Sequence, residues 1–316
     1  MGAPSVILRS LSLRRMIQPR APPSMVAPFP EKSRFDERLT AELDSLRSPQ
    51  QGGAGLIRFL DASIATQKIA LVMLGNVTYR DDIDREALEH YLETNVEILD
   101  ACNYFADKIE IVKKYLDSLR VVLRFVDGSF RSRMRATEHM ESIRGIERKH
   151  KIMSKRNGLR RILRQKLSHD ESELSEIMRG SRAMAVMACE FLELGLSFDS
   201  KRRIQKTTQS QRSRGSSCWL RVLQELVNQE EGSEKVQRKR CGSNLIMRDL
   251  KETVRDLEEV MKGKKREREV KFAVEGLKRK CRGLEDEIEI IEERVKDLYK
   301  SLIDVRMVLL GILSQA

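Results

Sequence analysis

The sequence predicts an all-α protein, an elongated antiparallel helical bundle with a long, coiled-coil-like C-terminal helix. Charged residues make up 34% of the 316 residues and aromatic residues only 5%. Leu, Glu, Lys, Arg and Ala dominate such a composition, and these side chains favour helix. Apolar residues also recur at helical spacing over two stretches of about 43 residues. No stretch shows the sustained period-two alternation that is typical of a strand.

The first 33 residues are predicted to be a disordered tail, followed by a helical domain over residues 34–316. Residues 1–30 contain four arginines, six prolines and no acidic residue. Prolines oppose a stable helix after Gln18, which favours disorder. An acid-poor start with arginines is also typical of an organelle transit peptide, so this alternative stays open.

Three helices are predicted in the first half of the domain. Residues 35–46 place apolar side chains on one face, and the sequence SPQQGGAG then ends the helix. Residues 56–74 are largely apolar. The third helix, residues 84–126, carries an apolar stripe with a mean spacing near 3.5 residues. It would span about 60 Å, so other long helices or a partner must cover it.

A basic segment, residues 131–166, contains thirteen Lys or Arg and three Glu, which accounts for +10 of the net charge of +12. It could contact anionic lipid headgroups, or it could be a solvated, partly disordered loop. Phe130 is the only aromatic residue in or beside it, so a stacking platform for single strands is absent and no nucleic acid is expected. The residues proposed to contact an anionic surface are Arg156, Arg160, Arg161, Arg164 and Lys166.

The apolar stretch 183–198 is predicted to be a buried bundle helix. A membrane span needs about twenty apolar residues, and this stretch has sixteen, with Glu190 and Glu193 inside. We interpret these two glutamates as a polar edge of the helix. A flexible loop is expected over residues 199–216, followed by helices within residues 217–261.

The C-terminal helix, residues 270–313, carries the strongest pattern in the chain. Apolar residues follow each other at alternating steps of four and three over six heptads, which is an a/d seam. The residues predicted to pack in this seam are Leu277, Leu284, Ile288, Ile291, Val295, Leu298, Leu302, Val305 and Leu309.

The seam could pair between chains as a coiled coil, or it could pack against residues 84–126 of the same chain. The same knobs-into-holes periodicity satisfies both. The matched lengths of the two helices favour packing within the chain. Met307, Val308 and Leu310 lie beyond the seam, so we expect more than one face of this helix to be covered.

No catalytic, cofactor or metal motif is recognisable. Five cysteines lack a C-x-x-C pair, so we expect reduced thiols. Four scattered histidines lack a metal-binding spacing. The sequence therefore indicates a protein without enzymatic activity, cofactor or small-molecule substrate.

Four stretches resemble the plant BYPASS family. They are RFDERLTAELDSLR (34–47), ALEHYLETNVEILDACNYFADKIE (87–110), AMAVMACEFLELGLSFDSKRR (183–203) and IEERVKDLYKSLIDVRMVLLGIL (291–313). They are spread over most of the chain beyond residue 33. None of them contains a catalytic signature.

The resemblance implies a plant-specific, mostly helical, non-enzymatic regulatory protein that acts through contacts with other proteins in growth, development or stress signalling. Founding members restrain a root-derived mobile signal that arrests shoot growth, and related members associate with exocyst subunits. The alternative function is a peripheral membrane or trafficking adaptor that uses residues 131–166. The resemblance implies a cytoplasmic protein, with endomembrane association as a further location, or a plastid protein if residues 1–30 are a transit peptide.

Overall fold

The computed structural model describes residues 34–47, 53–126, 130–156, 172–198, 217–226 and 267–315, with single positions between 247 and 259. Residues Lys32–Ala316 form one compact unit. The described residues form helices and their connecting turns and contain no strand, which confirms the all-α bundle. The expectations for residues 1–33 and 199–216 lie outside the described residues.

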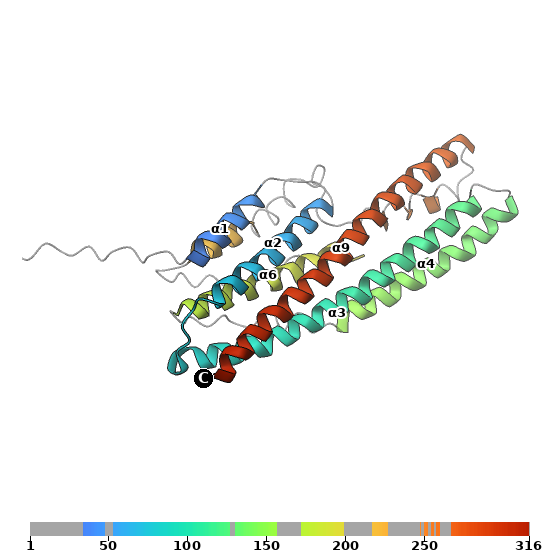
Figure 1. Ribbon diagram of the computed structural model, residues 1–316. Coiled ribbons are helices and arrows are strands. Elements are labelled where there is room, and N and C mark those ends of the chain that lie inside the picture. The colour runs from blue at the N-terminus through green and yellow to red at the C-terminus, as the bar shows by residue number, and fades with distance from the viewer. Residues whose placement is uncertain are drawn as a thin grey trace, which may run out of the picture. The chain divides into compact units, whose positions relative to one another are not determined.

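The bundle is built from long helices that lie side by side (Figure 1). In chain order they are α1 (Arg34–Ser45), α2 (Gly53–Leu74), α3 (Asp81–Val126), α4 (Phe130–Arg156), α6 (Glu173–Gly195) and α9 (Glu267–Gln315). The 49 residues of α9 give it a length of about 74 Å at 1.5 Å per residue.

Helices α3 and α9 run antiparallel. Near one end, Arg120 on α3 forms an ion pair with Glu285 on α9. Toward the other end, Asn95 Nδ2 on α3 donates to the carbonyl oxygen of Leu302 on α9, at 3.4 Å. Residue numbers thus rise along one helix as they fall along the other. The C-terminal helix therefore packs within its own chain, against α3 on one side and α2 on the other.

The seam faces the interior of the bundle, because its apolar side chains lose contact with water there. All nine predicted seam residues are buried. Met307 and Leu310, which we expected to be covered as well, are however 62% and 37% exposed. Val308 is half-buried against the core. The expectation that these three residues are covered is therefore wrong for Met307 and Leu310, although the helix does pack within the chain.

Residues 131–156 of the basic segment belong to helix α4 (Phe130–Arg156), so the loop interpretation is wrong for this part. Ala136, Met140 and Ile143 are buried on the side that packs on α3. The rings of Phe125 and His139 stack with centroids 5.2 Å apart. A narrow apolar stripe is enough here, because tertiary packing supplies most of the stability of a helix in a protein.

Helix α6 begins at Glu173, ten residues before the predicted start. Ser172 is its N-cap, and the Ser172 Oγ accepts a hydrogen bond from the backbone N–H of Ser175 at 3.0 Å. Such a cap contributes about 1 kcal/mol. The helix is buried between α2 and α3 over most of its length.

Helix α1 is held beside residues 218–226 by a carboxylate at a helix N-terminus. Asp36 accepts hydrogen bonds from the backbone N–H groups of Cys218, at 3.2 Å, and Trp219, at 2.9 Å. Both N–H groups belong to the first turn of the helix that begins at residue 218. A carboxylate at this position accepts hydrogen bonds from N–H groups that have no partner within the helix. Its negative charge also interacts favourably with the helix dipole.

Candidate functional site

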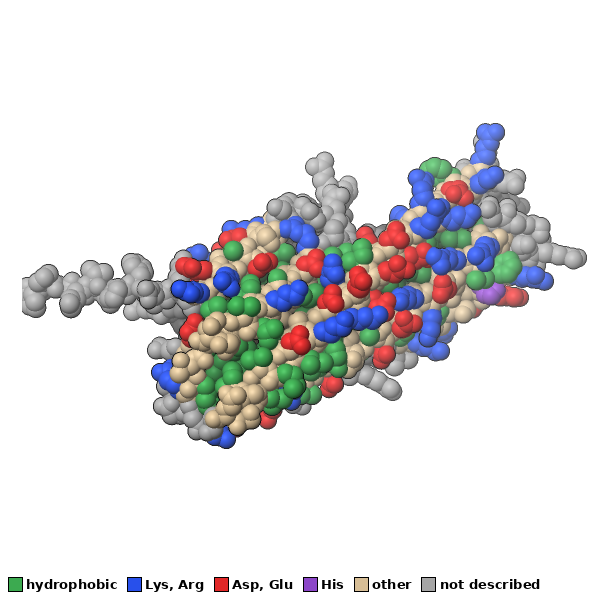
Figure 2. All heavy atoms as spheres, viewed as in Figure 1, with side chains coloured by type: hydrophobic (Ala, Val, Ile, Leu, Met, Phe, Trp, Pro, Cys, Tyr) green, Lys and Arg blue, Asp and Glu red, His purple; other side chains and the backbone are tan. Residues whose placement is uncertain are grey.

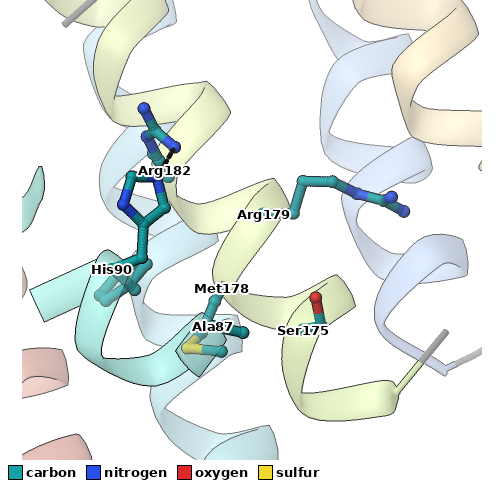
Figure 3. Close-up of a pocket in the computed structure, with 7 residues that line it drawn as sticks. Ala87, His90, Ser175, Met178, Arg179 and Arg182 are labelled. Carbon is teal, nitrogen blue, oxygen red and sulfur yellow. Dashed lines mark hydrogen bonds between the residues drawn. The ribbon is translucent and has the colours of Figure 1, made fainter. Parts of the chain in front are cut away.

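A hollow of about 280 Å³ lies where the first turns of α6 meet the N-terminal part of α3, and it opens to solvent (Figure 3). Among the described residues, three basic side chains line it together with apolar and hydroxyl groups, and no carboxylate does. The lining residues are Ala87, His90, Tyr91, Ser175, Met178, Arg179 and Arg182.

Arg182 and His90 lie next to each other at this hollow (Figure 3). The distance from Arg182 Nη1 to His90 Nε2 is 3.4 Å. A guanidinium has only donors, so Nε2 of His90 is the acceptor in this contact. The pair places a permanent cation and a titratable ring on two different helices at one opening.

Arg182 is only 5% exposed. This burial lowers the pKa of Arg182, and the negative charge of Glu97 acts in the opposite direction without cancelling the effect. Removal of a charged group from water has a cost that a nearby opposite charge must offset.

Arg179 contributes its stem to the hollow, but its guanidinium points away from His90 and Arg182 (Figure 3). Its Nη2 donates to Ser217 Oγ at 3.0 Å, and the guanidinium lies 5.9 Å from the ring centroid of Trp219. Ser217 in turn donates to Glu176 at 2.8 Å. Arg179 is therefore engaged with the segment that begins at residue 217.

The polar wall behind the hollow is fixed by a buried network. Ser181 Oγ donates to Gln67 Oε1 at 2.5 Å, and Gln67 Nε2 donates to the Ser181 carbonyl at 2.9 Å. Because the hydroxyl proton of Ser181 is used, the Tyr91 hydroxyl donates to Ser181 Oγ at 2.8 Å. Burial raises the pKa of Tyr91, so its phenol stays neutral. This network joins α2, α3 and α6.

A second buried polar group lies further along α3 and α6. Lys108 Nζ donates to Glu193 Oε2 at 2.8 Å, and the Tyr104 hydroxyl donates to the same oxygen at 3.1 Å. Both Glu190 and Glu193 are buried, so neither glutamate lies on a solvated edge of α6. Our interpretation of the two glutamates as a polar edge is thus corrected to buried positions, of which Glu193 pairs with a lysine.

Four exposed apolar side chains lie on α2, α3 and α9 near the C-terminal end of α9, and we call this set the apolar tip: Val72, Val96, Met307 and Leu310. Figure 1 shows α2 and α9 side by side and ending at the same end of the bundle as the start of α3. Hydrophobic side chains gather over this end in Figure 2, whereas charged side chains cover the middle of α9. Val96 follows Asn95, which contacts Leu302 of α9.

Most of the residues that we predicted to contact an anionic surface lie outside the described part of the chain. Arg156 is the last residue of α4. Arg160, Arg161, Arg164 and Lys166 lie outside the described residues, so their contact with an anionic surface stays a prediction.

The sequence did not single out Arg182, His90 or Lys108. Arg182 does leave a signal, because it interrupts an apolar stripe formed by Met178, Ala185 and Cys189 at helical spacing. A charged residue within such an apolar stripe indicates either a buried ion pair or a functional site.

The described residues show neither a metal-binding cluster nor a membrane-spanning helix. Within these residues, no three His, Cys, Asp or Glu side chains are grouped so that they could hold a metal ion. Among the described helices, none combines the length and the apolar character needed to cross a membrane.

Comparison with known proteins identifies the family. A model of the family described as Protein BPS1 matches residues 77–312, which is well over half of the chain and runs from just before α3 to near the end of α9. No curated protein and no solved structure matches the chain. The match includes the hollow between α3 and α6, the stretches 87–110 and 183–203, and all but the last residue of the stretch 291–313. The chain belongs to the BYPASS family.

Proposed function

We propose that this protein is a non-enzymatic regulatory protein that acts in plant growth and development, or in stress signalling, by binding other proteins at its apolar tip. Membership of the BYPASS family supports the regulatory role. The exposed apolar side chains at the end of α9 support the mode of action, because such areas are typical of protein contacts. Exocyst-type subunits are one class of partner that the family resemblance suggests.

The single observation that carries this proposal is the exposure of Met307 on a helix whose seam is otherwise satisfied. The seam side of α9 is filled by α2 and α3, so Met307, 62% exposed, and Leu310 are not needed for packing inside the chain. Methionine is adaptable and is common at binding surfaces. Val72, 58% exposed, adds apolar area from α2.

The test compares two variants of the full-length protein as baits in affinity purification from plant tissue. Met307→Asp with Leu310→Asp places charge on the apolar tip. Phe272→Asp is the matched control, because Phe272 is 77% exposed on the same helix, about 50 Å from Met307 at 1.5 Å per residue. We expect the tip variant to lose specific partners that the wild type and the Phe272 variant retain. Equal recovery of every partner by all three baits would refute a role for the tip.

A second function, a peripheral membrane or trafficking adaptor, is supported by the charge of helix α4. Arg135, Arg148 and Lys149 are exposed on it. Arg144 is less available, because it pairs with Glu141 and, at 3.1 Å, with Glu258. Lys and Arg near an anionic leaflet contribute about 1 kcal/mol each to binding.

Liposome co-sedimentation separates the two functions. The adaptor function predicts binding to vesicles with anionic lipid and none to neutral vesicles. Arg148→Gln with Lys149→Gln should weaken that binding, whereas Met307→Asp with Leu310→Asp should weaken protein contacts only. A lack of binding to anionic vesicles at low salt would exclude the adaptor function.

A further inference from the structure

We propose that the N-terminal part of α9 lies against the anionic leaflet of a membrane, with the Phe272 ring in the interface and basic side chains around it on the headgroups. This surface is independent of the apolar tip, and it adds a second membrane contact to the one that we proposed for α4. We call it the basic face of α9 and define it as Arg268, Lys271, Phe272, Arg279 and Arg282.

The exposure of Phe272 is the first argument. Its exposed fraction of 77% is the highest among the large hydrophobic side chains that the described residues expose. The ring lies on the outer side of the helix, because Val274 and Leu277 are buried on the opposite side. An apolar ring in water is unfavourable. An aromatic side chain among basic ones is typical of a helix that lies in a membrane interface.

The charge around Phe272 is the second argument. Residues 268–282 contain six Lys or Arg and two Glu, and the positive excess remains although Lys278 pairs with Glu275 at 3.0 Å. Arg268 lies one turn before Phe272 and Arg279 two turns after it, so both flank the ring on one face. These charges are complementary to an anionic leaflet.

The change of charge along α9 is the third argument. Residues 285–293 contain six acidic residues and no basic one. Lys and Arg side chains gather where α9 begins, and acidic side chains follow further along (Figure 2). Arg124 adds an exposed positive charge on α3, one turn beyond the residue that pairs with Glu285. An anionic leaflet repels the acidic stretch, so the bundle should approach it with the basic end of α9.

The shape of this surface favours a bilayer over a protein segment. The outer side of α9 is uncovered near Phe272, since no atom lies within 4 Å of a Cβ at Gly276 or Gly283. Both glycines lie on the same side of the helix as the Phe272 ring. The convex side of a single helix has no walls to enclose a peptide, whereas it can lie on a flat, fluid surface.

The experiment places a reporter at the centre of the basic face of α9. Phe272→Trp introduces an exposed indole, while Trp219, the only tryptophan of the native chain, is buried. The full-length variant is titrated with phosphatidylcholine vesicles that contain or lack phosphatidylserine. We expect anionic vesicles to shift the emission to shorter wavelength and brominated phosphatidylcholine within them to quench it. Neutral vesicles should have no effect, and added salt should weaken binding.

Charge variants measure the electrostatic part by vesicle co-sedimentation. Arg279→Gln with Arg282→Gln should weaken binding to anionic vesicles about tenfold or more, because two basic side chains are removed from the leaflet. Lys296→Gln with Lys300→Gln is the matched control. It makes the same charge change at two exposed positions of α9 beyond the acidic stretch, and it should leave binding unchanged. Circular dichroism checks that each variant is folded.

The outcomes separate this contact from the other proposed functions. Weaker binding of Arg279→Gln with Arg282→Gln, together with quenching of the new indole, supports the contact whether or not the α4 variant also binds less. Binding that is lost only in Arg148→Gln with Lys149→Gln overturns it and leaves the adaptor function of α4 in place. An indole emission that anionic vesicles do not change also overturns it, and the apolar tip is then unaffected. Loss of a protein partner by Phe272→Asp without any vesicle response would identify an acidic protein as the occupant instead.

Discussion

Lys108 on α3 and Glu193 on α6 form an ion pair with 2.8 Å between Nζ and Oε2, and the lysine side chain is fully enclosed. The hydroxyl of Tyr104 donates to the same carboxylate oxygen. The ammonium also lies 5.6 Å from the centroid of the Tyr104 ring. This group ties two central helices together inside the bundle.

Loss of one partner of this pair should destabilise the protein strongly. Lys108→Met leaves the Glu193 carboxylate buried without its cation, and we expect a loss of about 3–5 kcal/mol in the free energy of unfolding. Lys108→Met combined with Glu193→Met should cost much less, since no charge then remains buried. Urea denaturation of the single and double variants measures the difference, and a double variant as unstable as Lys108→Met would contradict this account.

The internal packing of α9 predicts a clear contrast between two neighbouring positions. Leu298→Ala removes a fully buried seam side chain and should cost about 2–5 kcal/mol. Lys300→Ala changes an exposed residue and should alter stability by less than about 0.5 kcal/mol. A truncation that ends at Glu269 should lose cooperative unfolding altogether. Cooperative unfolding of the truncated chain would show that α9 does not complete the core.

Two glycines within helices should respond to alanine in opposite directions. A Cβ atom at Gly180 would meet the ring of Phe35 and the side chain of Leu39, both buried on α1. Gly180→Ala should therefore destabilise the protein by about 1–3 kcal/mol through overpacking. No atom lies within 4 Å of a Cβ at Gly276, so Gly276→Ala should stabilise α9 by about 0.5–1 kcal/mol. Thermal unfolding of both variants checks the signs.

Two glutamates of α9 should contribute to stability with opposite pH dependence. The hydrogen bond from Lys113, followed by the one from Lys296, lowers the pKa of Glu292 below its usual 4.5. Its folded-state pKa thus lies below the unfolded one, so its stabilisation is present above pH 4.5 and is lost as the pH falls through the folded pKa. Burial raises the pKa of Glu287, and the resulting destabilisation is present above that raised pKa and vanishes below pH 4.5.

We therefore expect Glu292→Gln to lower the free energy of unfolding at neutral pH and to have no effect in strong acid. Glu287→Gln should raise it at neutral pH. Urea denaturation at a series of pH values measures both differences. The same sign for the two variants at neutral pH would contradict the assignment.

The cysteines should differ in reactivity. Burial is the main cause that raises the pKa of Cys281 to about 11. A hydrogen bond with Cys102 and then burial raise the pKa of Cys189 well above its usual range. Since the thiolate is the nucleophile, iodoacetamide at pH 8 should modify the half-buried Cys218 well before Cys102, Cys189 or Cys281. Peptide mass spectrometry of the native protein measures the order, and unfolding in urea should abolish the difference among these four.

The sequence by itself determined the class of the fold and the residues by which its last helix is buried. The a/d repeat could be read directly, because a periodic stripe must be buried somewhere and helix length limits what can bury it. The bounds of α3 and α9 agree with the predicted helices to within three residues. The burial of Lys108 could also have been predicted from the sequence, since Lys108 occupies a position in the apolar stripe of Ile98, Ala101, Phe105 and Val112.

Only the tertiary structure decided which side chains outside the seam are buried and which charges meet. Helix α4 has too few apolar residues to be recognised alone, and its burial depends on the surface that α3 offers. Met307 and Leu310 differ little in character from their buried neighbours, and they are exposed because no other described helix covers that side of α9. Arg182 and His90 lie 92 positions apart, and they meet only because α6 packs beside α3. Periodicity is a local property of the chain, whereas these outcomes depend on contacts between residues far apart in sequence.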